Sequence, residues 1–256
     1  MKNHFSEAEW SARVDLAACY RLVSLYGMTD LINNHISAKI PGTDNEFLIN
    51  PFGLMYEEVT ASSLFKVNLQ GEVLYRPDLP YDFNRAGFVI HSAVHEARPD
   101  VVSVLHTHTR AGIAVATMKD GLLPITQGAL RFFNRTGYHE FEGPAVDDDE
   151  KARLVANLGT HDTLILRNHG LLTCGRSIAE AFLLMQRLET ACKIQVDLLA
   201  SGAELVWPTQ VAQEKTARIL APAKERRGEG LGVWDGSREW SALLRQVERK
   251  LPGFNV

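Results

Sequence analysis

The chain has 256 residues, of which 45% are hydrophobic and 23% charged, and its formal net charge is −4. These values are ordinary for a globular protein of one large or two small domains, and they exclude collagen-like, disordered and low-complexity chains. The sequence has no extended basic run of the kind that binds nucleic acid, and no apolar run reaches the roughly 18 residues of a transmembrane helix. The polar N-terminus is unlike a signal peptide. We therefore predict a cytoplasmic protein without a nucleic-acid or membrane partner.

The first half of the chain predicts a helix, a strand meander, and a second helix that leads into a strand. Apolar residues at steps of three and four indicate a first helix, and Asn84 is a typical N-cap for the second, which ends before Pro99. Short apolar or alternating runs between turn signals indicate the strands. We place the helices at residues 7–26 and 84–98, and the strands at 36–40, 47–50, 64–68, 72–75 and 101–105.

The second half alternates helices with strands and ends in a tail. Helices are expected at residues 110–118, 149–158 and 178–199, and strands at 163–167 and 171–173. The tail is predicted to contain a helical stretch at 214–220, a basic and then Gly-rich segment, and a last short helix, all loosely attached. We assign residues 1–220 to one domain and 221–256 to a partly helical C-terminal tail.

Strands mixed with helices, first as a meander and later alternating, favour an α/β or α+β three-layer sandwich over a doubly wound sheet. The sequence lacks both GxGxxG and GxxxxGK[ST], so it does not indicate a dinucleotide-binding site or a P-loop. Its three cysteines, Cys19, Cys174 and Cys192, are widely spaced and form no CxxC pair. This spacing predicts reduced, buried thiols rather than a disulfide framework.

The sharpest local signal is the sequence His106-Thr107-His108 at the end of a predicted strand. Side chains two residues apart in a strand point the same way, so two imidazoles can face one point while Thr107 faces away. A third candidate, His169, also follows a strand-like run, and its neighbour Gly170 permits close backbone approach. Three imidazoles converging from two strand ends would leave the open coordination position of a catalytic zinc site.

Spacing alone supports a structural role for these histidines as well as a metal site. His169 could be a turn residue that bonds its own loop, and the other two could be a buried pair satisfied by backbone carbonyls.

Several motifs in order make this sequence resemble the class II aldolase/adducin family, specifically its adducin-like bacterial branch. They are Asn34-His35-Ile36-Ser37, Pro51-Phe52-Gly53, the segment from His91 to His108, and Asn168-His169-Gly170-Leu171-Leu172, and the resemblance spans roughly residues 10–200. It implies a three-layer α/β/α sandwich with a mixed, mainly antiparallel sheet, and a homotetramer with active sites between subunits. It also implies a divalent metal, usually zinc but with manganese or iron as alternatives, held by His106, His108 and His169.

One position departs from the sugar-phosphate aldolases of that family. Where they have a catalytic glutamate preceded by two phosphate-binding serines, this chain has Gly87 preceded by Arg85 and Ala86. Glycine can neither transfer a proton nor bind a metal, so phospho-aldolase activity does not carry over. A different reaction at the same metal, such as decarboxylation, remains compatible with the three histidines.

Other residues are candidates for the remaining roles. The missing proton carrier could be His91, His139 or Tyr138, with Glu140 as a further option, although packing is the simpler role for His91 and its helix neighbour His95. Arg131, four residues before Arg135, could clamp a substrate carboxylate, although a solvated face or a subunit salt bridge is the simpler role. His35 and Ser37 could line the substrate pocket, or serve the turn that contains them.

The sequence therefore predicts a metal-dependent lyase. Its reaction would be aldol cleavage or decarboxylation of a small hydroxy or keto carboxylic acid through a cation-stabilised enolate. The alternative is a catalytically silent, adducin-like scaffold that assembles with itself or a partner. Three ligating histidines favour the lyase, because a silent scaffold has no need of them.

Overall fold

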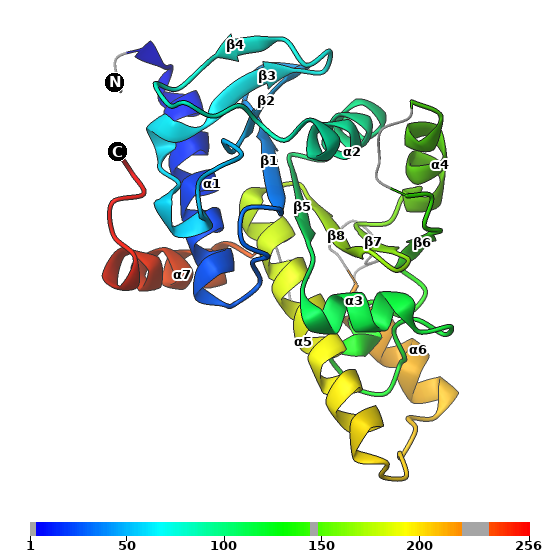
Figure 1. Ribbon diagram of the computed structural model, residues 1–256. Coiled ribbons are helices and arrows are strands. Elements are labelled where there is room, and N and C mark those ends of the chain that lie inside the picture. The colour runs from blue at the N-terminus through cyan, green and yellow to red at the C-terminus, as the bar shows by residue number, and fades with distance from the viewer. Residues whose placement is uncertain (1–3, 144–147, 222–235) are drawn as a thin grey trace.

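The computed structural model describes residues 4–143, 148–221 and 236–256. Eight strands form one mixed sheet in the order β4-β3-β2-β1-β5-β8-β7-β6, with helices on both faces (Figure 1). All neighbouring strands are antiparallel except β6 and β7, which are parallel. The strands are β1 His35–Lys39, β2 Glu46–Ile49, β3 Phe65–Asn68, β4 Val73–Tyr75, β5 Ser103–Thr107, β6 Gly137–His139, β7 Thr163–Leu166 and β8 Gly170–Gly175. The predicted three-layer fold is confirmed.

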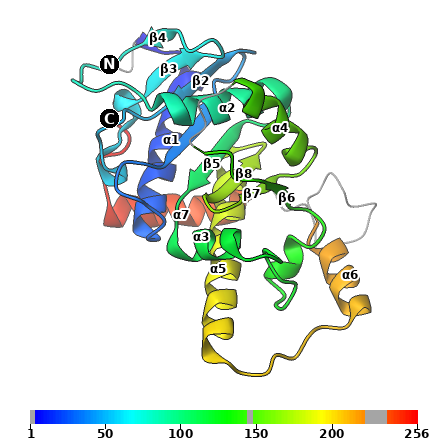
Figure 2. The same cartoon turned by 45° about the vertical axis from the view of Figure 1, so that its right-hand side comes forward.

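The helices divide between the two faces of the sheet. One face packs against α1 and α5, with α7 outside α1, and the other is covered by α2 and α4 (Figures 1 and 2). α3 lies at the end of β5 and packs on α5 and β8. The helices are α1 Glu7–Leu25, α2 Arg85–Ala97, α3 Arg110–Thr117, α4 Asp148–Leu158, α5 Ile178–Ser201, α6 Gln210–Ile219 and α7 Ser237–Lys250, with short 3₁₀ turns at Tyr56–Glu58, Ala61–Ser63 and Ala129–Arg131. None of the helices within the described ranges is both long and apolar enough to cross a membrane.

The pairing of β1 with β5 sets which side chains share a face of the sheet. In this antiparallel pair His35 lies opposite His106, and Ser37 lies opposite Val104. Side chains alternate along each strand, so Ile36 and Leu105 enter the core against the other helix layer. His35, Ser37 and His106 are therefore on the face that α2 covers.

Most predicted elements are found, with three differences. The strand expected at 101–105 is β5, at Ser103–Thr107, because its ladder is set by pairing with β1 and β8. β6 was not predicted, since three residues carry too little periodicity and the strand exists only by pairing with β7. The helix expected at 214–220 is longer and begins after the cap Thr209. The three cysteines are buried and free, as predicted.

The prediction of a loosely attached tail is wrong for residues 236–256. Trp240, Leu243 and Val247 are buried against the core, and the indole nitrogen of Trp240 donates to Asp15 at 3.2 Å. Beyond α7, Arg21 of α1 donates to the carbonyls of residues 251–253. The basic segment and most of the Gly-rich segment fall in 222–235, outside the described residues. The sequence predicted a last short helix but not the surface that it covers.

We expect Trp240→Ala to lower the free energy of unfolding by about 3–5 kcal/mol, because it removes a buried indole and its hydrogen bond. Urea denaturation monitored by circular dichroism measures the change. Arg245→Ala, on the exposed side of the same helix, should change stability by less than about 0.5 kcal/mol. Equal effects of the two substitutions would contradict the packing of α7.

Candidate metal centre

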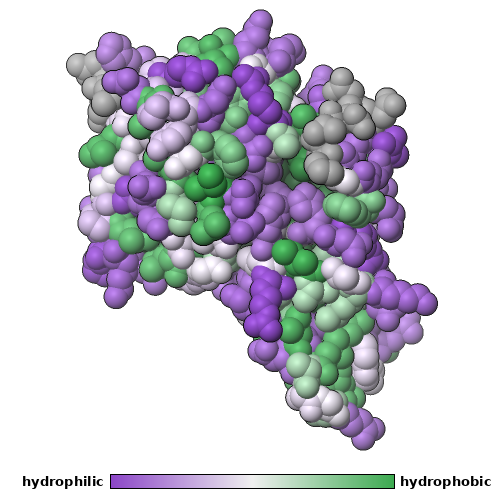
Figure 3. Space-filling model, viewed as in Figure 1, coloured by the Kyte–Doolittle hydropathy of each residue, from purple (hydrophilic) through white to green (hydrophobic). Residues whose placement is uncertain are grey.

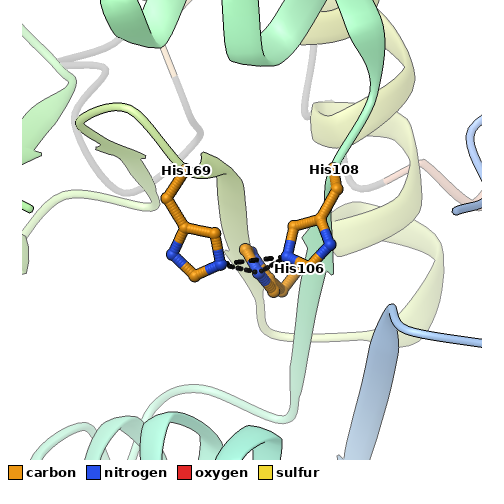
Figure 4. A group of neighbouring side chains, drawn as sticks. All are labelled: His106, His108 and His169. Carbon is orange, nitrogen blue, oxygen red and sulfur yellow. Dashed lines mark hydrogen bonds between the residues drawn. The ribbon is translucent and has the colours of Figure 1, made fainter. Parts of the chain in front are cut away.

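Three histidine side chains meet at one point beyond the ends of β5 and β7 (Figure 4). The Nε2 atom of His106 lies 2.7 Å from that of His108 and 3.3 Å from that of His169, and the last two are 3.0 Å apart. His106 belongs to β5, His108 follows that strand, and His169 lies in the turn between β7 and β8. Thr107 points to the opposite face and contacts Met185 of α5, as predicted. The three predicted ligands therefore come together.

The turn before β8 brings His169 to the other two histidines. Asn168 has a left-handed backbone with φ of 56°, a conformation that asparagine tolerates better than most residues. A Cβ atom on Gly170 would overlap the carbonyl of Thr107 and stand 3.3 Å from both the His106 and His108 rings. Glycine is thus required at this position for β8 to approach β5 closely, as its place in the sequence suggested.

Hydrogen bonds on the far side of two rings determine which nitrogen carries the proton. Nδ1 of His106 lies 3.0 Å from the carbonyl oxygen of Leu171, and Nδ1 of His108 lies 3.2 Å from Oδ2 of Asp30. Neither oxygen has a proton to give, so each Nδ1 is the donor, and a ring with a single proton then keeps a bare Nε2. Burial lowers the pKa of His106 well below its usual value and lowers that of His169 to about 4, so both stay neutral at pH 7.

The donor set fits a divalent cation. Bare Nε2 atoms of His106 and His108 only 2.7 Å apart cannot bond each other, because no proton lies between them. A cation between these lone pairs would remove that repulsion, and imidazoles oriented by hydrogen bonds on their outer nitrogens, as His106 and His108 are, are a common zinc-binding arrangement. The proximity of the three rings and the tautomers inferred for two of them therefore support a metal site.

Two residues, Asp30 and Asn34, hold His108 in place, and their positions in the sequence did not indicate this role. Asp30 orients its ring, and the side-chain oxygen of Asn34 accepts a hydrogen bond from its backbone nitrogen at 3.2 Å. Asn34 also donates to the carbonyl of Met28, which fixes the loop before β1. Asp30 stands in no motif, and only the closure of this loop onto the end of β5 brings it to the ring.

A second group of imidazoles lies beside the first, between β1 and α2. Nδ1 of His35 is 2.7 Å from Nε2 of His91, Nδ1 of His91 is 2.5 Å from Oγ of Ser37, and that oxygen is 2.8 Å from Nε2 of His95. His35 and Ser37 are two residues apart on β1, so they share one face of that strand. His91 and His95 are four residues apart on α2, so they share one face of that helix. The ring centroids of His35 and His106 are 5.0 Å apart, so the two groups adjoin.

Burial controls the charge of this second group. It lowers the pKa of His35 and His91 well below the usual histidine value and lowers that of His95 to about 3. Neighbouring imidazoles act in the same direction on His35 and His91, and the Lys39 ammonium does so on His95, because a second positive charge nearby is unfavourable. His35, His91 and His95 are therefore neutral.

His35 occupies the space beside Gly87. A Cβ atom built on Gly87 would overlap the His35 ring and stand 2.6 Å from its Nε2. Asn84 caps α2 by accepting from the Gly87 nitrogen at 3.2 Å, so the first turn of the helix is fixed in place. Because Gly87 has no side chain, the first turn of α2 leaves room for the imidazole of His35.

The other predicted proton carriers lie in β6 or directly after it. The Tyr138 hydroxyl accepts from the nitrogen of Leu122 at 3.1 Å, and its ring stacks with Arg167. His139 lies 2.9 Å from Oδ1 of Asn157, and shares the lining of a small pocket with His169. That pocket is also lined by Glu140, Glu150 and Arg167.

The two arginines of the 130s lie against α6. Arg131 donates to the carbonyl of Leu220 at 3.0 Å, and Arg135 donates to that of Ala217 at 2.8 Å. Within this chain these contacts fix the C-terminal end of α6. Among the candidates, His35, Ser37 and His91 are thus joined to one another next to the three histidines, whereas Tyr138 and Arg131 make their contacts elsewhere.

Known proteins with the same fold and sequence pattern identify the family. A family model described as the class II aldolase and adducin N-terminal domain matches residues 14–196. The chain belongs to the class II aldolase and adducin family. It is 53% identical over 250 residues to a Pseudomonas aeruginosa protein that carries aldolase class 2 in its name, covering 97% of this chain and 93% of that protein.

Two solved structures and an adducin extend this comparison. An aldolase II superfamily protein from Pseudomonas syringae matches with a TM-score of 0.91 and 45% identity over 100% of this chain and 99% of that one. L-Fuculose 1-phosphate aldolase from Glaciozyma antarctica matches with a TM-score of 0.81 and 25% identity, covering 96% and 93%. Rat alpha-adducin is 43% identical over 95% of this chain, which spans only 34% of that protein.

We expect Asp30→Asn to weaken zinc binding by roughly tenfold, because loss of an outer carboxylate at a ligating histidine commonly costs that much or more. Competition with a fluorescent chelator measures the affinity. The matched control is Asp44→Asn, which changes a carboxylate in an exposed loop and should leave the affinity unchanged. Unaltered affinity in Asp30→Asn would show that this contact does not hold His108 for a cation.

We also expect Gly87→Ala to destabilise the protein, because the added methyl group overlaps His35. Elsewhere inside a helix the same substitution stabilises by roughly 0.5–1 kcal/mol. In a His35→Ala background the overlap is gone, so Gly87→Ala should become neutral or stabilising. Urea denaturation of the two single variants and the double variant gives the coupling; additive effects would contradict the contact.

Proposed function

We propose that this protein is a metal-dependent lyase that cleaves a carbon–carbon bond in a small hydroxy or keto carboxylic acid, by aldol cleavage or decarboxylation. The observation that carries the proposal is the convergence of the Nε2 atoms of His106, His108 and His169. A divalent cation held there, with zinc the first choice and manganese or iron as alternatives, would stabilise negative charge developing on substrate oxygens.

A structural neighbour supports the lyase class, whereas the residues at the start of α2 argue against a phosphorylated substrate. One structural neighbour at 25% identity is named L-fuculose 1-phosphate aldolase. This chain has Arg85, Ala86 and Gly87 at the start of α2, where no hydroxyl or carboxylate is available. We therefore propose a carboxylic acid in place of a sugar phosphate. Of the predicted proton carriers His91, His139 and Tyr138, His91 is hydrogen-bonded to the ring beside the metal site.

A second candidate function is an adducin-like scaffold without catalysis. It is favoured by the 43% identity to rat alpha-adducin over nearly the whole of this chain. The two functions differ in their need for a cation, because a scaffold requires only the fold.

Metal content tests the proposal directly. We expect about one zinc, manganese or iron per subunit in protein purified without added metal or a histidine tag, as for a single catalytic site. Elemental mass spectrometry measures it. His106→Ala and His169→Ala should each lose most of the metal, whereas His4→Ala, which changes an exposed histidine, should keep it. A metal-free protein, even after dialysis against zinc, would favour the scaffold.

We further propose that the protein is a homotetramer. α5 projects beyond the sheet and its connection returns to α6, forming an arm (Figure 2). Apolar side chains gather along this arm (Figure 3). They include Leu199, Val206, Trp207 and Val211, of which Val206 is 93% exposed. Exposed apolar groups on a projecting element are typical of a surface that another subunit covers.

We expect the double substitution Val206→Glu and Trp207→Glu to reduce the mass of the assembly, because two charges would be buried in the interface. Sedimentation velocity measures the mass. Val256→Glu changes an exposed apolar residue away from the arm, and its assembly should match the unsubstituted protein. An unsubstituted protein that sediments as a monomer would contradict the tetramer.

A further inference from the structure

A large cavity lies away from the three histidines, where α1, α7 and the start of α5 meet (Figure 1). Its volume is about 810 Å³, which is within the roughly 300–1,000 Å³ of small-molecule sites in proteins. It is lined by Lys39 at the last position of β1, whereas His35 at the first position of that strand lies beside His106. The cavity is therefore at the opposite end of β1 from the metal site.

Small side chains on α1 leave this cavity open. Ala8 lines it together with the residues three, four and seven positions later, which share one face of the helix. Those residues are Ser11, Ala12 and Asp15. The start of α5 adds Ile178 and Ala179, Trp240 of α7 is also in the lining, and most of the lining surface is apolar. An apolar group that binds against these walls would be removed from water, which favours binding.

The two positively charged residues of the lining are engaged elsewhere. Arg176 forms ion pairs with Glu180 and Asp162. Lys39 is two residues after Ser37 on β1, so its side chain leaves the strand on the face that α2 covers. There its Nζ atom donates, at 3.4 Å, to the carbonyl oxygen of the residue that caps the C-terminus of α2. We therefore expect neither cation to attract an anion into the cavity.

Asp15 has no ion-pair partner among the residues that the structure describes. Its Oδ1 atom accepts a hydrogen bond from the indole nitrogen of Trp240 at 3.2 Å, which holds the carboxylate in place. A carboxylate has lone pairs for about four hydrogen bonds, so most of its capacity is unused. Burial raises the pKa of this carboxyl, because partial removal from water disfavours the charged form. A cation bound beside Asp15 would compensate for that loss of hydration.

We propose that this cavity binds a protonated organic amine, with its ammonium group paired to Asp15 and its apolar body against the walls formed by α1 and α5. The site needs no metal at the three histidines, so it is independent of the proposed lyase reaction. A neutral ligand would cover the carboxylate without giving it a charged partner, and an anion would bring a like charge beside it. The carboxylate and the apolar walls together therefore select amines that carry a hydrocarbon group.

The first test compares 2-phenylethylamine, which is protonated at pH 7, with 2-phenylethanol, a neutral molecule of nearly the same shape. Isothermal titration of the full chain measures both. We expect the amine to bind with a Kd of about 1 mM or below. The alcohol should bind about tenfold to a hundredfold more weakly, the range for one contact with a charged group. No binding of the amine, or equal binding of the two molecules, would overturn the proposal.

Substitutions in the lining locate the binding site. Asp15→Asn keeps an oxygen that can accept from the Trp240 indole but removes the charge, so the preference for the amine should be lost. Ser11→Trp places a large side chain in the cavity and should abolish binding of both molecules. The matched control Asp78→Asn, which changes a carboxylate in an exposed loop, should keep the preference. An unchanged preference in Asp15→Asn, or unchanged binding in Ser11→Trp, would place the amine elsewhere and overturn the proposal.

Stability without a ligand distinguishes binding from a structural role of Asp15. Folding raises the pKa of this carboxyl, so its charged form lowers the stability of the fold at pH values above that pKa. Asp15→Asn should therefore leave the urea midpoint at pH 7 unchanged or raise it. If Asp15 served only to hold the Trp240 indole, the midpoint would fall and the amine preference would remain. That combination would overturn the proposal.

Discussion

The antiparallel pairing of β5 with β1 on one side and β8 on the other is the constraint on which the site depends. It puts His35 opposite His106 and gives the His106 ring a backbone carbonyl, from Leu171, to donate to. A shift of one residue in either register would turn these side chains to the opposite face, where α5 packs. Buried strands with apolar alternate residues resist such a shift, so the register fixes both the position and the tautomer of the central ligand.

Burial determines the protonation state of these histidines. Histidines in water near pH 7 are partly charged, and several charged rings together would repel one another. Enclosed between the sheet and α2, the imidazoles are held neutral, and each then offers one donor and one acceptor. The hydrogen bonds that satisfy Nδ1 of His106 and His108 leave their lone pairs directed at a common point.

Membership of the class II aldolase and adducin family does not by itself choose between the two proposed functions, since the names of the relatives include both aldolases and adducins. Within this chain, Gly87 is paired with His35. The sequence alone shows a residue without a side chain at the start of α2, which suggests an empty position. The structure shows that the buried ring of His35 fills the adjacent volume, so a polar group is present there.

Local sequence patterns were enough to predict the helices, most strands and the cap Asn84, because these depend on residues close together along the chain. It also singled out His106, His108 and His169, since a two-residue step on a strand and a turn glycine have predictable directions. The role of Asp30, the short strand β6, the packing of α7, and the contact of His35 with both Gly87 and His91 were decided only in three dimensions. Each joins segments far apart in the chain, and such pairings follow from which surfaces are left to be buried together, which no single stretch of sequence encodes.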